Sequence, residues 1–251
     1  MSVMSSQRPS CRLGVFVKCP HAEMIEAIGL AGFDFAVVDM EHTPLGPRDL
    51  YPLVLAAECR GVDVVVRIPS KDDAYFKWCR DLDISAIQVP HVESKDDALR
   101  AIEQSYFSPQ GGRGLCRFVR AAGFSAIPKE KYLREANDRN RLILQIEGRR
   151  GIENLPQIVE VMPAEASIFI GPYDLSQSLG KPGQIWDPEV VAAMEKIVGL
   201  CRDRGIGVGT FTDTPDGISH WASRGVSFVE YASDLHLFMQ GAASIVKVDR
   251  G

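Results

Sequence analysis

Short apolar runs alternate with longer amphipathic segments along the chain. The apolar runs are mostly unbroken rather than alternating with polar residues, which is typical of parallel strands covered on both faces. The predicted strands are Leu13–Val17, Phe35–Val38, Val62–Ile68, Ala86–Val89, Leu142–Ile146, Ile168–Ile170, Ile206–Phe211 and Ser227–Tyr231. The predicted helices are His21–Ala31, Pro47–Arg60, Asp72–Asp81, Lys95–Tyr106, Glu153–Val161, Pro188–Arg204 and Pro215–Arg224. This order of elements predicts an α/β fold, a single-domain (β/α)8 TIM barrel.

Glycines support this order of elements. Gly32, Gly205 and Gly225 stand where three helices should stop, and the next strand follows each at once. A doubly wound open sheet is the alternative, but no G-x-G-x-x-G motif follows the first strand, which counts against a dinucleotide-binding fold. We expect residues 1–10 to form a flexible, polar N-terminal segment without the apolar core of a signal peptide, and residues 11–251 to form the barrel.

One connection is longer than the regular alternation of strands and helices predicts. Between the fourth and fifth strands, a long segment begins with Ser108–Gly114 and continues through Arg120 to Lys131. Long loops in compact domains are usually functional or mobile, so we expect one of these roles here.

Charge and composition narrow the function classes. The chain has 28 Lys and Arg against 33 Asp and Glu, with no basic block, which argues against nucleic acid or an anionic membrane as the main partner. No apolar run approaches the roughly 18 residues of a membrane span. The six cysteines are scattered without a C-x-x-C pair, and we interpret them as reduced thiols of a cytoplasmic protein.

Two carboxylates follow neighbouring apolar runs and suggest a metal site. Glu147 follows Leu142–Ile146 closely, and Asp174 follows Ile168–Ile170. Carboxylates at the C-terminal ends of adjacent strands can share a hard divalent cation, with Gln145 beside them. Taken singly, Glu147 could instead pair with a neighbouring arginine, and Asp174 could cap the helix that follows it.

A second group of polar residues follows the second and third strands. His42 comes three residues after Asp39, so the carboxylate could orient its ring, and such a histidine can act as a general base near neutral pH. Arg67 ends an apolar run, where it could hold a substrate oxyanion. The structural alternatives are a loop-capping histidine and a buried ion pair. Glu41 is not assigned a role.

Three further residues are weaker candidates. His91 follows a proline and is more typical of a surface loop. Lys18 could form a Schiff base, but the carboxylate pair favours a metal in that electrostatic role. Arg113 could bind an anion or lie in solvent.

Six motifs in order give the chain a family resemblance. They are Val38–His42, Val66–Pro69, Gln88–Ser94, Gly112–Gly114, Gln145–Glu147 and Gly171–Ser176, the last continuing to Gly180. In these stretches, which span nearly the whole chain, the sequence resembles the HpcH/HpaI family of class II, metal-dependent pyruvate aldolases, which cleave 2-keto-3-deoxy sugar acids and related 4-hydroxy-2-oxo acids.

The resemblance implies specific roles. Glu147 and Asp174 would bind Mg²⁺, Mn²⁺ or Co²⁺, and Gln145 would lie near the metal or the substrate. Arg67 would contact the keto oxygen that becomes the enolate, and the backbone amides of Tyr173 and Asp174 would hold the pyruvate carboxylate.

Two further implications concern the proton and the assembly. His42, oriented by Asp39, would move the proton through a water. Asp83 would reach the site of a neighbouring subunit in a homo-oligomer, a hexamer or a trimer. The chain departs from the family at Ile84-Ser85 and at Tyr173, where a small residue is usual.

The predicted function is therefore metal-dependent, reversible retro-aldol cleavage of a 4-hydroxy-2-oxo acid into pyruvate and an aldehyde. The enzyme would be a carbon–carbon lyase, and its partner a small-molecule oxo acid. The alternatives are oxaloacetate decarboxylation or another pyruvate-enolate reaction like that of macrophomate synthase, and an inactive barrel that serves as a scaffold. The sequence leaves the aldehyde and the physiological metal open.

Overall fold

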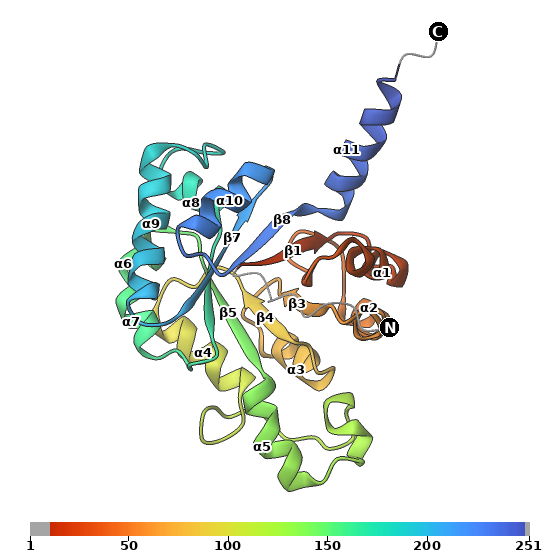
Figure 1. Cartoon of the computed structure of the whole chain (residues 1–251). Helices are drawn as coiled ribbons and strands as arrows, with labels where there is room; N and C mark the ends of the chain where they lie inside the picture. Colours follow the sequence, from red (N-terminus) through yellow and green to blue (C-terminus); the bar gives the residue numbers. More distant parts are fainter. Residues whose placement is uncertain (1–10, 249–251) are drawn as a thin grey trace.

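The computed structural model describes residues 11–248, in which eight parallel strands close into a barrel (Figure 1). The strands are β1 (Arg12–Val17), β2 (Phe35–Asp39), β3 (Asp63–Arg67), β4 (Ala86–Val89), β5 (Arg141–Ile146), β6 (Ser167–Ile170), β7 (Gly207–Thr212) and β8 (Phe228–Ser233). Each strand pairs with the next in the sequence, and β8 pairs with β1 to close the ring. The predicted (β/α)8 fold is confirmed, whereas the predicted N-terminal segment, residues 1–10, lies outside the described residues.

Helices surround most of this ring. They are α1 (Ala22–Ala31), α2 (Pro47–Arg60), α3 (Asp73–Asp81), α4 (Lys95–Ser105), the 3-10 helix η1 (Arg120–Ser125), α5 (Lys129–Arg139), α6 (Arg149–Glu153), α7 (Leu155–Glu160), α8 (Pro172–Ser178), α9 (Pro188–Arg202), α10 (Pro215–Ser223) and α11 (Asp234–Val246). The predicted helices are found within a few residues of their bounds, with Glu153–Val161 appearing as α7 and the end of α6. Gly32 takes a positive φ of 94° where α1 ends, as the sequence predicts.

Helices α5 and α11 were not predicted, and α8 was expected only as the helix that Asp174 could cap. Helix α5 lies in the connection that we expected to be a loop, and it is so polar that only Tyr132 and Ala136 are buried. These two side chains pack with Phe107, Ala121 and Ala122 in a small separate core. Part of the long connection is therefore held by its own packing.

The two faces of each strand pack in different environments. Residues of one parity point outward and form the main core with the helices, as Val64 and Val66 do. Residues of the other parity fill the barrel, where Phe16, Val37, Val65 and Phe169 belong to one apolar cluster. Continuing this inward parity to the C-terminal ends of the strands gives Lys18, Asp39, Arg67, Gln145, Glu147 and Asp213. The period of two along a strand thus aims these polar side chains at the mouth of the barrel.

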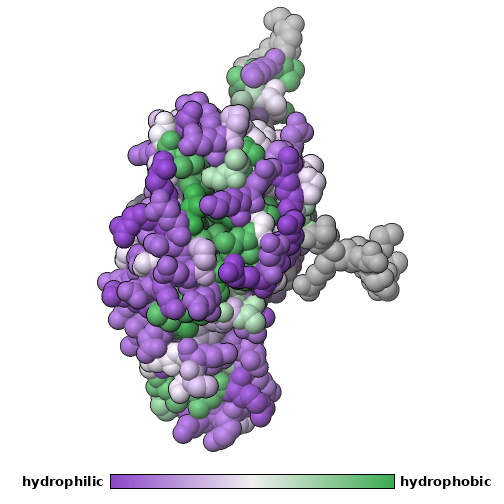
Figure 2. Space-filling model, turned by 90° about the vertical axis from the view of Figure 1, so that its left-hand side faces the viewer, coloured by the Kyte–Doolittle hydropathy of each residue, from purple (hydrophilic) through white to green (hydrophobic). Residues whose placement is uncertain are grey.

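Helix α11 does not cover the barrel. In Figure 1 it points away from the body instead of lying between α10 and α1. Asp234 is its only buried residue, and Phe238 and Met239 are exposed. Figure 2 shows apolar surface on this projecting segment. Within residues 11–248, no helix combines the length and apolar character that a membrane span needs.

Candidate active site

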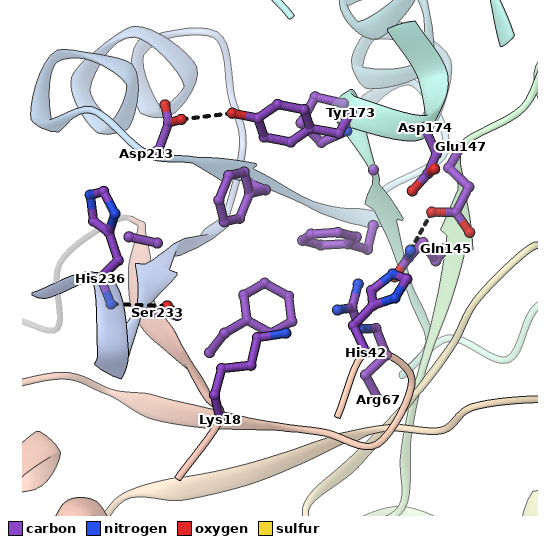
Figure 3. Close-up of a pocket in the computed structure, with 16 residues that line it drawn as sticks. Lys18, His42, Arg67, Gln145, Glu147, Tyr173, Asp174, Asp213, Ser233 and His236 are labelled. Carbon is purple, nitrogen blue, oxygen red and sulfur yellow. Dashed lines mark hydrogen bonds between the residues drawn. The ribbon is translucent and has the colours of Figure 1, made fainter. Parts of the chain in front are cut away.

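A cavity of about 350 Å³ opens at the C-terminal ends of the strands (Figure 3). Its walls include most of the predicted site residues, namely His42, Arg67, Gln145, Glu147, Tyr173 and Asp174. Lys18 also lines it, and Asp39 lies buried beneath it. The fold therefore brings together residues that are far apart in the sequence, at the end of the barrel where TIM barrels hold their chemistry.

The predicted metal ligands lie on one side of this cavity. Glu147, just after β5, is only 4% exposed, while Asp174 in the first turn of α8 is exposed. Both line the cavity, and Figure 3 shows their carboxylates next to each other. Glu147 Oε1 accepts a hydrogen bond from the His91 backbone amide at 2.7 Å, and Oε2 accepts one from the Gln145 side-chain amide. Burial would raise the pKa of Glu147, but the hydrogen bonds from His91 and Gln145 outweigh it, and the pKa falls below its ordinary value.

Gly171 makes this arrangement possible. A Cβ at this position would lie 2.7 Å from Glu147 Oε2 and 3.4 Å from Gln145 Nε2. Because the first distance is shorter than any normal contact, a side chain here would displace the carboxylate. The glycine before Pro172 is thus needed for the close approach of β6 to Glu147.

The donor chemistry fits a hard divalent ion. Two carboxylates face one cavity, and no group of three or more His, Cys, Asp or Glu side chains suited to a metal ion occurs in residues 11–248. Mg²⁺ is commonly held by one or two carboxylates while it keeps several waters and contacts the substrate. The residues present therefore suit Mg²⁺ or Mn²⁺ better than a closed zinc site.

A second side of the cavity is built on Asp39. Arg67 Nε and Nη2 donate to the two Asp39 oxygens at 2.9 and 2.8 Å, and Lys18 Nζ is also paired with Asp39. Burial would raise the pKa of Asp39, but Arg67 and Lys18 lower it to about 2. The Arg67 guanidinium also lies over the Phe16 ring, 4.6 Å from its centroid. Both its position and its charge are therefore fixed.

The predicted contact between Asp39 and the His42 ring is not present. Asp39 Oδ1 accepts a hydrogen bond from the backbone amide of His42 at 3.3 Å, not from its ring. The reason is that the carboxylate is already engaged by Arg67 and Lys18. The ring lies at the cavity wall, 3.9 Å from the carboxylate of Glu41.

His91, a weak candidate from the sequence, and Glu41, which had no assigned role, connect the two sides. His91 Nδ1 lies 2.9 Å from Glu147 and its Nε2 lies 3.2 Å from Glu41. Glu41 in turn lies 3.2 Å from Arg67 Nε. The hydrogen bond to Glu147 raises the pKa of His91 to about 9 in spite of its partial burial. No strand or helix pattern signals His91, because it sits in a loop with a φ of 53°.

Tyr173 forms the part of the wall opposite Lys18 (Figure 3). Its hydroxyl donates to Asp213 at 2.7 Å, and its ring packs 5.8 Å from the ring of Phe211. Partial burial and the bond to Asp213 raise the pKa of Tyr173 to about 12. The side chain thus faces the cavity, not the segment around Gly112–Gly114.

Some cavity residues were missed by the sequence analysis. Asp213, Phe16 and Phe169 could have been found from the inward parity of their strands. Ser233 and His236 also line the cavity, and they come from the end of β8 and the start of α11. Nothing in the sequence pattern marks these two residues, because the helix that carries His236 was not predicted.

Two other candidates lie away from the cavity. Arg113 is paired with Asp81 at 2.9 Å and lies over the Phe107 ring, so its role is structural. Asp83 lies in the turn between α3 and β4, at the opposite end of the barrel from the cavity. It does not belong to the site of its own chain.

Sequence comparison decides the family. The sequence profile of the HpcH/HpaI aldolase/citrate lyase family matches residues 12–241. The chain belongs to this family. A relative from Pseudomonas putida, 2-dehydro-3,6-dideoxy-6-sulfogluconate aldolase, is 32% identical over 98% of this chain and 95% of its own length.

Further relatives agree. A pyruvate aldolase from Rhizobium etli is 32% identical over 93% of the chain and 91% of its own length. The crystal structure of a family protein from Burkholderia cenocepacia J2315 superposes with a TM-score of 0.88 at 27% identity, covering 95% of this chain and 94% of that one. The predicted family and the predicted enzyme class, a carbon–carbon lyase, are confirmed.

Proposed function

We propose that this enzyme catalyses metal-dependent, reversible retro-aldol cleavage of a 4-hydroxy-2-oxo acid into pyruvate and an aldehyde. The observation that carries the proposal is one cavity lined by a carboxylate pair, Glu147 and Asp174, and by the fixed cation Arg67. Cleavage of this kind develops negative charge on the keto oxygen of the pyruvate half. Positive charge held in place at that oxygen lowers the barrier.

Glu147 and Asp174 would hold the divalent ion, Mg²⁺, Mn²⁺ or Co²⁺. When bound, the ion supplies Lewis-acid polarisation of the oxo acid. Gln145 holds Glu147 in place through its side-chain amide. The amides of Tyr173 and Asp174 begin α8 and have no partner within the helix, which suits them to a substrate carboxylate.

Arg67 would contact the keto oxygen as it becomes an enolate oxygen. Its guanidinium reaches the cavity while Asp39 holds it from below. Asp39 therefore acts by positioning Arg67, and it keeps the guanidinium where charge develops.

His42 would move the proton of the substrate hydroxyl. Its ring lies at the cavity wall, and its side chain is 62% exposed. A histidine that is open to solvent can take a proton directly or through one water. In decarboxylation of oxaloacetate, which passes through the same enolate, this step is not needed.

We further propose that the enzyme is a homo-oligomer, a hexamer or a trimer, in which α11 packs on a second copy. Within residues 11–248, α11 follows β8 but projects away from the barrel instead of lying along it (Figure 1), and its exposed apolar side chains include Phe238 and Met239. Asp83, at the far end of the barrel, would then reach a neighbouring site. Light scattering should give a multiple of 27.6 kDa, and the double substitution Phe238→Glu/Met239→Glu should reduce the mass. A monomeric wild type would overturn this proposal.

The six cysteines support a cytoplasmic location. All of them are free thiols, and Cys79 and Cys201 are buried. Unpaired thiols persist in a reducing compartment.

Chelation and an aldehyde panel test the function. EDTA treatment should abolish release of pyruvate from 4-hydroxy-2-oxo acids, and Mg²⁺, Mn²⁺ or Co²⁺ should restore it. A panel of aldehydes with pyruvate, run in the condensation direction, would identify the acceptor. Full activity in chelator, or a borohydride-trapped pyruvate adduct on Lys18, would contradict the metal mechanism.

A further inference from the structure

A chain of buried polar side chains runs through the barrel interior to the predicted metal site. It starts at Glu230 on β8, passes Gln88 on β4 and Gln145 on β5, and ends at Glu147. Gln88 and Glu230 are fully buried, and Gln145 is 1% exposed. Buried polar groups with so little access to water rely on one another for hydrogen bonds, so each orientation depends on the next. Two oxygens of this chain, Gln88 Oε1 and Glu230 Oε1, have no partner among the described residues.

Gln88 determines which way the Gln145 amide faces. Gln88 Nε2 donates to Gln145 Oε1 at 2.7 Å, so the oxygen of Gln145 faces away from the cavity end of β5. The Gln145 NH₂ group is then left to donate to Glu147 Oε2. A flipped Gln145 would place its oxygen against the Glu147 carboxylate and its NH₂ against the NH₂ of Gln88, which loses both hydrogen bonds.

Glu230 fixes Gln88 in turn. The same Gln88 nitrogen lies 3.4 Å from Glu230 Oε2, so a flip of Gln88 would lose this contact and bring its oxygen against the acceptor oxygen of Gln145. Burial raises the pKa of Glu230 to about 8, with Arg67 and Asp39 as the nearby charged groups. A carboxyl group in either protonation state keeps an oxygen that accepts this bond.

We propose that Gln88 is a positioning residue that locks Gln145 as a hydrogen-bond donor to Glu147. With Gln145 held in this way, Glu147 would face the divalent ion in one orientation, and the Gln145 oxygen would point away from that ion. This inference rests on the proposed function, because it assumes that Glu147 and Asp174 bind the ion. Groups that orient a metal ligand in this way commonly change metal affinity 10–100-fold when lost, so we expect an effect of about that size.

Mn²⁺ affinity, measured by electron paramagnetic resonance of the free ion, tests the proposal without any substrate. Gln88→Met removes the donor and keeps the length of the side chain, so its Kd for Mn²⁺ should rise about tenfold or more. Glu230→Gln keeps an acceptor oxygen, so its Kd should stay close to that of the wild type. Thr210→Val is the matched control, because Thr210 is equally buried but bonds only the Ile170 carbonyl.

A double-mutant cycle shows whether Gln88 acts through Gln145. In a Gln145→Met background, Gln88→Met should weaken Mn²⁺ binding little further, since the contact that it controls is already gone. Circular dichroism in EDTA checks that each variant is folded. A Kd unchanged in folded Gln88→Met, or additive losses in the cycle, would overturn the inference and leave the proposed function standing. Failure of the wild type itself to bind Mn²⁺ would overturn both.

Discussion

The two sides of the cavity hold their carboxylates in different ways. On the Arg67 side, Asp39 is paired with Arg67 and Lys18, so its charge is balanced inside the protein. On the other side, Glu147 is held mainly by amide groups and by His91, and Asp174 is exposed. The first arrangement holds the Arg67 guanidinium in place, and the charge of Asp39 needs no added ion to balance it. The second pairs Glu147 with His91 but leaves the exposed Asp174 carboxylate facing the cavity, where an added divalent ion would neutralise it.

The largest expected effect comes from removing a ligand on the Glu147 side. Asp174→Ala should lower Mn²⁺ affinity and reduce pyruvate release on the order of 10³-fold, because metal polarisation supplies several kcal/mol. Steady-state kinetics at saturating Mg²⁺, alongside Mn²⁺ titration, provides the measurement. An Asp174→Ala enzyme with normal Mn²⁺ affinity would show that the two sides of the cavity do not differ as described.

On the opposite side, Arg67→Met should act without touching metal binding. The loss of fixed charge at the enolate oxygen should slow aldol cleavage, oxaloacetate decarboxylation and pyruvate proton exchange together, by about 10²–10³-fold. Mn²⁺ affinity should stay near that of the wild type. If Arg67→Met instead abolished Mn²⁺ binding, the distinction between a side whose charges pair within the protein and a side that binds a divalent ion would be wrong.

His42 should separate two reactions that share the enolate. His42→Ala should reduce aldol cleavage about 10²-fold, the lower end of general-base catalysis. Decarboxylation of oxaloacetate should fall much less, because it needs no deprotonated hydroxyl. The ratio of the two rates in one preparation is the readout, and equal losses in both reactions would remove His42 from the proton step.

Tyr173 should give the smallest effect, on the choice of acceptor. Tyr173→Ala removes the ring that packs on Phe211 but keeps the backbone amide. We expect a wider range of accepted aldehydes, with preferences shifted by about tenfold, and a nearly unchanged KM for pyruvate, since a pocket methylene alone is worth about 1–3 kcal/mol.

Tyr173→Phe is the matched control for the ring itself. It removes only the hydrogen bond to Asp213, so it separates the ring from the hydroxyl. An aldehyde profile that does not change in Tyr173→Ala would show that the ring plays no part in acceptor choice.

The strand ends explain why much of the site could be predicted. Glu147 and Asp174 each follow an apolar run closely, and in parallel strands all such positions meet at one end of the barrel. The same rule placed Arg67 and His42 near them. It could not predict that Asp39 would bind Arg67 instead of the His42 ring. That pairing depends on which side chain lies within hydrogen-bond distance of the carboxylate in the folded barrel.

Local sequence alone determined the order of the eight strands and of the helices between most of them, the helix stops at glycine and the end of the barrel that carries polar groups. These features follow from periodicity and backbone preferences between near neighbours. Tertiary structure alone decided the partners of Asp39, the bridge from His91 to Glu147 and Glu41, the contact of Tyr173 with Asp213 and the chain from Glu230 to Glu147. Each of these joins residues from different strands or loops, and hydrogen-bond geometry between them is fixed only when the barrel closes.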